Sequence, residues 1–224
     1  EAEPVHKSIR EAGFGGINRY KELEKMKNSE IVTSTARRLD DIMSKTYVQS
    51  ISYDKIMDLA RDKENMLASL PAIQPISNID LTRTASGWGY RIHPIYKIRK
   101  FHYGMDFTAP TGTEIYATAD GTIEDIDKSK RGYGNKIIIN HGFGYKTLYA
   151  HLSGFTVKHG QKVKRGDVIG YVGNTGLSTA PHLHYEVLLN NKKVNPVNYY
   201  FNDLSPEEYD KMIELSLRAG QSFD

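Results

Sequence analysis

Four side chains with metal-binding chemistry occur in two short motifs. His102-x-x-x-Asp106 places an imidazole and a carboxylate four residues apart, and His182-x-His184 places two imidazoles two residues apart. On a β-strand, positions separated by two or four residues point to the same face, so each motif presents its polar groups together. Gly104 leaves space directly above the backbone within the first motif. We therefore expect a metal site built from these motifs.

The available ligands limit the kind of metal site. The chain has no cysteine, which excludes disulfides, thiolate ligands and a cysteine nucleophile. Zinc accepts His nitrogen and carboxylate oxygen, and a catalytic zinc site uses three protein ligands and keeps the fourth position for water. Two histidines and one aspartate supply that number. Such a site activates a water and polarises a carbonyl, so the pattern predicts metal-assisted hydrolysis.

Two histidines are candidates for moving protons, because imidazole titrates near neutral pH and can act as base and then as acid. His151 ends a predicted strand, and His182 is the other half of the His-x-His pair. Between them they would deprotonate a water, stabilise the developing charge and protonate a leaving amine.

The elements that must position these side chains change character near Pro71. Before it, apolar residues recur at helical spacing, and we expect two amphipathic helices, with stripes over residues 32–43 and 56–67. Residues 28–29 and 50–52 are the expected N-caps, and Pro71 ends the second helix.

Beyond a linker over residues 71–84, the chain is β-rich. Short runs of Ile, Val, Tyr and Thr alternate with glycine turns, which favours an antiparallel sheet, sandwich or open barrel. Asn190-Asn191 is the expected tip of a hairpin that returns through Lys192–Val194. The other expected strands are Glu114–Ala119, Gly121–Asp127, Lys136–His141, Lys146–His151, Asp167–Val172 and His184–Leu189.

A tail helix follows, because Ser205-Pro206 with Glu208 forms a capping-box signature. It is expected to end near Gly220. We therefore divide the chain into an α-helical N-terminal region and linker (1–74), a mainly β catalytic domain (75–202), and a C-terminal helix and tail (203–224).

Composition narrows the class of protein. The 224 residues carry 30 basic and 27 acidic side chains and a net charge of +3, so charge alone does not indicate nucleic acid. The mean hydropathy is −0.53, and no apolar run approaches the roughly 18 residues that span a bilayer. Residues 1–4 lack the features of a signal peptide, so we expect either a cytoplasmic protein or one whose leader or anchor has been removed.

Taken together, these motifs resemble the LytM/lysostaphin-type zinc metallopeptidases, peptidase family M23. The resemblance spans about Ser86 to Asn198. It rests on His102-x-x-x-Asp106, Tyr149-Ala150-His151-Leu152 and Pro181-His182-Leu183-His184-Tyr185-Glu186, flanked by Ser86-Gly87-Trp88-Gly89-Tyr90-Arg91-Ile92-His93-Pro94, Ala109-Pro110-Thr111-Gly112-Thr113 and Gly166–Gly173.

The resemblance implies one Zn²⁺ per chain, bound by His102, Asp106 and His184. His151 and His182 would be the unligated catalytic histidines. A tyrosine shortly before the first ligand can stabilise the oxyanion in this family, and Tyr96 lies at about the right distance. The implied reaction is endopeptidic hydrolysis of an amide in peptidoglycan stem peptides or cross-bridges. It would take place outside the cytoplasm, in the bacterial cell envelope, with any membrane anchor outside the present sequence.

Two other functions match parts of the pattern. Some members of this superfamily have lost their ligands and activate other wall hydrolases, so a latent or regulatory zinc protein is an alternative, although every ligand is retained here. Residues 119–123 and 163–170 are also similar to the hammerhead strands of biotinyl and lipoyl carrier domains. No lysine lies in an exposed hairpin between them, so we attribute this similarity to shared β-architecture.

Several polar residues near the motifs have two interpretations each. Glu186 shares the strand face of the two histidines and either orients an imidazole or is a solvated carboxylate. The cluster Lys97-Ile98-Arg99-Lys100 either attracts anionic wall polymer or is a charged loop tip. His93 either shapes a loop or lies in a substrate cleft, and His141 is expected in a turn.

Overall fold

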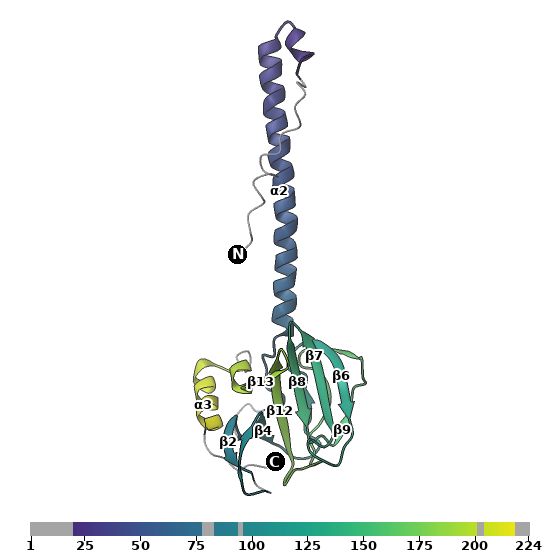
Figure 1. Cartoon of the computed structure of the whole chain (residues 1–224), viewed down its shortest axis with the longest axis vertical. Coiled ribbons are helices and arrows are strands. Elements are labelled where there is room, and N and C mark those ends of the chain that lie inside the picture. The colour runs from purple at the N-terminus through teal and green to yellow at the C-terminus, as the bar shows by residue number, and fades with distance from the viewer. Residues whose placement is uncertain (1–19, 78–82, 94–95, 201–203, 218–224) are drawn as a thin grey trace. The chain divides into compact units, whose positions relative to one another are not determined.

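A computed structural model describes residues 20–77, 83–93, 96–200 and 204–217 (Figure 1). Contacts divide the chain into two units, Glu1–Glu64 and Asn65–Asp224. In the first, η1 (Leu23–Lys25) precedes α2 (Ser29–Ser69), a helix of 41 residues whose last turn belongs to the second unit. No helix in the described part of the chain has both the length and the apolar content needed to cross a membrane.

The single helix α2 replaces the two helices expected from the sequence, so the N-cap predicted at residues 50–52 was wrong. No Gly or Pro occurs between Ser29 and Ser69, and serine inside a helix lowers its stability by only a few tenths of a kcal/mol. Nothing in the chain therefore forces a break. The end of the helix was predicted correctly, since α2 stops at Ser69, just before Pro71.

The second unit is mainly antiparallel β-sheet, which confirms the fold class. Its largest sheet has the order β1-β4-β12-β8-β7-β6-β10, with β13 paired to β12; β5-β11-β9 and β2-β3 form two smaller sheets. The strands are β1 (Thr84–Ser86), β2 (Gly89–Ile92), β3 (Arg99–His102), β4 (Met105–Thr108), β5 (Glu114–Tyr116), β6 (Gly121–Asp127), β7 (Lys136–Gly142), β8 (Tyr145–Ala150), β9 (Gly154–Phe155), β10 (Lys162–Val163), β11 (Val168–Tyr171), β12 (His182–Leu189) and β13 (Lys192–Val194).

The central strands carry both the core and the candidate site. β12 lies between β4 and β8 in register, with His184 opposite Asp106 on one side and Ala150 on the other. Alternate residues of β12 point the other way, and Leu183 and Tyr185 are fully buried in the apolar core. The strand thus presents its histidines on one face, and the buried side chains of its opposite face hold it in the apolar core.

The segment predicted as a linker packs onto the β-rich unit over its described residues. Ala72 and Ile76 are buried, the Ala72 amide donates to the Thr118 carbonyl at 3.1 Å, and the Tyr116 amide donates to the Pro75 carbonyl at 2.8 Å. The linker prediction was therefore wrong over residues 71–77. Proline, serine and asparagine suggested a loop, but the few apolar residues among them complete the core.

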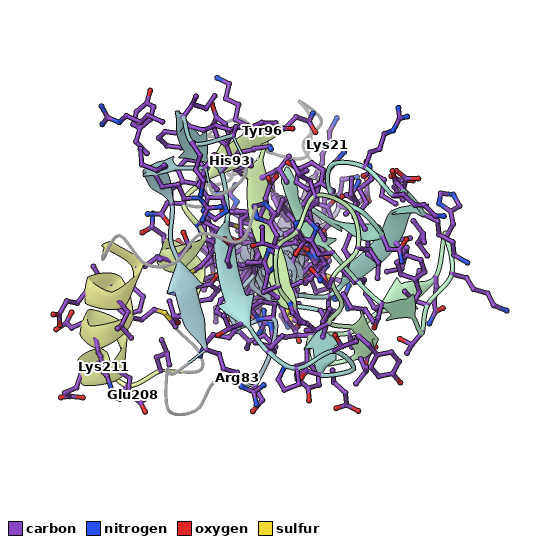
Figure 2. The ribbon with its side chains drawn as sticks, turned by 90° about the horizontal axis from the view of Figure 1, so that it is seen from below. Lys21, Arg83, His93, Tyr96, Glu208 and Lys211 are labelled. Atoms are coloured by element: carbon purple, nitrogen blue, oxygen red, sulfur yellow. The ribbon has the colours of Figure 1, made fainter. Side chains whose placement is uncertain are left out.

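After η2 (Pro196–Tyr199), helix α3 (Pro206–Leu217) lies at one flank of the sheet beside β2 in Figure 1 and packs against β1. Its start is the predicted capping box: the Ser205 amide donates to Glu208 Oε2 at 2.8 Å, and the Glu208 amide donates to Ser205 Oγ at 3.3 Å. Met212 is buried beneath the helix, whereas Glu208 and Lys211 point outward in Figure 2. The predicted end near Gly220 lies outside the described residues.

Candidate metal and catalytic site

The three predicted ligands meet at one point of the second unit. His102 Nε2 lies 3.0 Å from His184 Nδ1 and 3.2 Å from Asp106 Oδ1, and His184 Nδ1 lies 3.0 Å from Asp106 Oδ1. All three residues are buried. A tetrahedral zinc ion with bonds of about 2.0–2.1 Å holds its ligand atoms about 3.3 Å apart. The triangle therefore has the size that such an ion requires.

The hydrogen bonds of the two imidazoles indicate which nitrogen of each ring faces this triangle without a proton. His102 Nδ1 donates to the Gly87 carbonyl at 2.7 Å, and His184 Nε2 donates to Glu186 Oε1 at 3.1 Å. In neutral rings this leaves lone pairs on His102 Nε2 and His184 Nδ1. Two lone pairs and a carboxylate oxygen repel one another at these distances unless a cation lies among them. The residues present thus fit a bound metal ion.

Each candidate ligand also has a partner that orients it. The Asp106 carboxylate binds Arg91 Nη1 through Oδ2 at 2.8 Å, while its other oxygen faces the triangle. Arg91 also donates to Ser86. Groups of this kind hold metal ligands in a productive orientation. The interpretation of Glu186 as an orienting acceptor is therefore favoured over that of a solvated carboxylate.

Glu186 itself is held by two further side chains. Its Oε1 accepts from Tyr133 Oη at 2.7 Å and from Lys193 Nζ at 2.9 Å, and Lys193 Nζ also donates to Tyr133 Oη at 2.8 Å. Burial raises the pKa of the Glu186 carboxyl, but the hydrogen bonds from His184 and Lys193 and the charge of Lys193 outweigh burial and lower the pKa below its ordinary value. The carboxylate form is therefore the one that His184 contacts.

The first motif is not a single strand, contrary to the expected same-face geometry. His102 ends β3 and Asp106 lies in β4, and these strands belong to different sheets. The intervening Gly104 lies against the second motif: a Cβ there would be 2.6 Å from the Tyr185 carbonyl oxygen and 2.7 Å from His184 Cε1. Only glycine lets the two motifs approach this closely.

The proposed proton-transfer histidines lie side by side next to the ligands. The ring centroids of His151 and His182 are 4.7 Å apart, and that of His151 is 6.1 Å from that of His184. His151 Nδ1 donates to the Thr175 carbonyl at 2.7 Å, and His182 Nδ1 donates to the Ala180 carbonyl at 2.8 Å. Each neutral ring therefore carries its lone pair on Nε2. His151 has φ 65°, a left-handed backbone that is uncommon for a non-glycine residue and is often found at functional sites.

Tyr96 lies at the approach to the site rather than in it. Its side chain is 55% exposed, and its ring centroid is 4.5 Å from that of His93. Both residues are labelled in Figure 2. His93 is buried and lines the cavity, whereas Tyr96 is not among the lining residues. The cleft interpretation of His93 is thus favoured.

A cavity of about 320 Å³ opens beside the ligands. Aromatic side chains of the β2–β3 hairpin and of the following turn form part of its wall, with ring centroids of Phe101 and Tyr103 4.8 Å apart. The lining residues are Arg91, His93, Lys100, Phe101, His102, Tyr103, Gly132, Tyr133, His151, Leu177, His184 and Glu186. The cavity thus brings together two ligands, the orienting side chains Arg91 and Glu186, and one of the proton-transfer candidates.

The comparisons with known proteins agree with this geometry. A family model described as peptidase family M23 matches residues 100–196. The catalytic domain of the antimicrobial peptidase lysostaphin from Staphylococcus simulans is 34% identical, with a TM-score of 0.50, over 55% of this chain and 97% of that domain. The chain belongs to peptidase family M23.

Two of the curated relatives have names that state an activity. The DD-carboxypeptidase/endopeptidase Mpg of Neisseria meningitidis is 51% identical over 117 residues, which are 52% of this chain and 27% of Mpg. The peptidoglycan DD-endopeptidase ShyA of Vibrio cholerae is 46% identical over 105 residues, which are 47% of this chain and 24% of ShyA. The chain therefore spans about a quarter of the length of these relatives.

The sequence motifs led to the ligands but not to most of the groups that orient them. Gly87 and Thr175 contribute backbone carbonyls, which no side-chain pattern reveals. Tyr133 and Lys193 come from a turn and from β13, and only tertiary structure places them at Glu186. His141 also differs from its prediction: it is buried in β7, bonded to the Asp120 carbonyl and Thr147 Oγ1.

Proposed function

We propose that this chain is a zinc-dependent endopeptidase that hydrolyses an amide bond in the peptide part of peptidoglycan. The substrate class is supported by the similarity to ShyA, which is named a peptidoglycan DD-endopeptidase. Action on the wall places the protein outside the cytoplasm, in the bacterial cell envelope. Zinc is supported by the donor set, since two imidazoles and one carboxylate without cysteine match its catalytic sites.

The observation that carries the proposal is the convergence of three lone-pair atoms within 3.2 Å of one another, beside a cavity. A bound zinc ion supplies Lewis-acid activation of the scissile carbonyl and of a water. The fixed hydrogen bonds from the imidazoles to the Gly87 carbonyl and to Glu186, and from Arg91 to Asp106, hold the metal-binding atoms in the orientation that this chemistry needs.

The remaining roles belong to the chain's own side chains. His151, which lines the cavity with its lone pair on Nε2, accepts the proton of the attacking water and returns it to the leaving amine. His182, 4.7 Å away between ring centroids, stabilises the charge that develops during this transfer. Tyr96 donates a hydrogen bond to the oxyanion. Because it is exposed, this role requires its side chain to turn toward the cavity when substrate binds.

Digestion of purified peptidoglycan tests the proposed reaction. The zinc-loaded protein should release peptide fragments whose masses identify a cleaved amide, and a chelator should abolish the release until zinc is restored. Stoichiometric zinc without any cleavage would instead favour the latent or regulatory alternative.

The His151→Ala variant tests the division of labour within the site. We expect kcat to fall by roughly 10²- to 10⁴-fold, the usual contribution of general acid–base catalysis, with one zinc per chain retained. Zinc content is measured by atomic absorption on the same sample. Unchanged activity would remove His151 from the mechanism, and loss of zinc would make it a ligand.

A further inference from the structure

The charged groups that line the cavity do not balance. Arg91 is neutralised by Asp106, with 2.8 Å between Nη1 and Oδ2. Glu186, the carboxylate among the lining residues, is neutralised by Lys193, with 2.9 Å between Oε1 and Nζ. Lys100 also lines the cavity, and within the described ranges no carboxylate pairs with it. The Lys100 Nζ lies 6.0 Å from the centroid of the Tyr96 ring.

The position of Lys100 on β3 directs this charge toward the site. Lys100 and His102 are two residues apart on one strand, so both project from the same face, about 7 Å apart along the backbone. Lys100 also lies directly opposite Arg91 in the β2–β3 register. Like charges in that arrangement destabilise a sheet, so the fold itself gains nothing from the pair.

We propose that Lys100 binds a carboxylate of the substrate peptide, and so selects stem peptides that carry a free carboxylate near the scissile bond. This inference rests on the proposed function and specifies its substrate. An extended peptide covers about 7 Å in two residues, so the carboxylate lies within about two residues of the scissile amide. Phe101 and Tyr103 also line the cavity and give the peptide an apolar surface beside the exposed Lys100.

Peptide binding to the zinc-loaded protein tests the inference without requiring cleavage. The probes are two fluorescein-labelled stem tetrapeptides that end in D-alanine. Their internal carboxylates are free in one and amidated in the other, and both keep the terminal carboxylate. Kd is measured by fluorescence anisotropy. We expect the free-carboxylate peptide to bind roughly two- to fivefold more tightly, because Lys100 is exposed and water weakens an exposed ion pair. Added salt should reduce this preference.

Variants of two neighbouring residues assign the preference to one side chain. Lys100→Gln should bring both peptides to the same Kd, and Lys100→Arg should restore the difference. Arg99→Gln is the matched control, because it removes the same charge from the same strand but lies on the opposite face, over the Tyr90 ring; it should keep the preference.

The outcomes separate this inference from the proposed function. Equal binding of the two peptides by the wild-type protein, or a preference that persists in Lys100→Gln, would overturn the role of Lys100. Failure of the same zinc-loaded protein to cut cross-linked peptidoglycan would instead overturn the endopeptidase proposal. A preference for the free-carboxylate peptide that Lys100→Gln removes and Arg99→Gln keeps supports the inference, whether or not the protein cuts peptidoglycan.

Discussion

At the scale of single residues, the site depends on orienting contacts that converge from separate elements. His184 is the ligand with the longest chain of support, since Glu186 receives hydrogen bonds from Tyr133 and Lys193 as well as from the imidazole. A carboxylate tethered in this way keeps the proton on His184 Nε2 and the lone pair on Nδ1. The strength of metal binding should therefore depend on side chains that never touch the metal.

Removing Lys193 tests this dependence. We expect Lys193→Met to weaken zinc binding by up to about tenfold, the low end of the range for loss of a ligand's direct partner, because Lys193 acts on His184 only through Glu186. Zinc affinity is measured by competition with a chromophoric chelator. Lys192→Met is the matched control, because Lys192 is an exposed neighbour on β13; equal zinc affinities for the two variants would exclude the role of Lys193.

His141 gives a second prediction at this scale, on stability rather than catalysis. Burial is the main cause that lowers its pKa from 6.5 to about 4, despite the hydrogen bond to the Asp120 carbonyl. The unfolded chain therefore binds a proton between these pH values that the folded chain does not. The free energy of unfolding therefore has its full value, as far as His141 is concerned, above pH 6.5. It decreases as the pH falls toward 4, by roughly 3 kcal/mol at most.

Urea unfolding at pH 7.5 and pH 5 measures this effect. The free energy of unfolding should fall less between these pH values in His141→Gln than in the wild-type protein. His159→Gln, at an exposed position, should follow the wild type. Parallel curves for all three proteins would show that His141 is not responsible.

At the scale of elements, the approach of the two motifs depends on the β3–β4 turn. Gly104→Ala places a methyl group 2.7 Å from the His184 ring and 2.6 Å from the Tyr185 carbonyl, so His184 must shift. We expect a clear loss of zinc affinity with retained β-sheet content, measured by chelator competition and circular dichroism. Gly154→Ala is the control, since its nearest atom is 4.0 Å away. Zinc affinity equal in both variants would contradict the packing argument.

Elements defined by local chemistry were predictable from the sequence, and those defined by distant contacts were not. Asn190 and Asn191 adopt φ 51° and 61°, as the hairpin between β12 and β13 requires, and Ser205 with Glu208 caps α3. By contrast, β2 and β3 hold exposed aromatic and basic residues whose alternation is weak, and the sequence did not identify these strands. Because these strands were not identified, the separation of His102 and Asp106 into two sheets was not predicted.

At the scale of the whole molecule, the site lies entirely within residues 65–224. A chain reduced to these residues should therefore retain one zinc ion and the zinc-dependent cleavage of peptidoglycan, within about twofold of the longer chain. Its thermal unfolding should remain cooperative, because the core cluster starts at Ile76. Loss of the folded state on truncation would show that the first unit supports the second.

Sheet membership has a further consequence for how the molecule responds to its substrate. His102 belongs to the β2–β3 sheet, whereas Asp106 and His184 belong to the largest sheet. An ion held by all three is therefore a cross-link between two sheets, and it limits the positions that the β2–β3 hairpin can adopt. Because the hairpin also carries Lys100, metal occupancy and recognition of the peptide's charge become thermodynamically coupled. By reciprocity, a peptide that binds through its carboxylate should slow the loss of the metal.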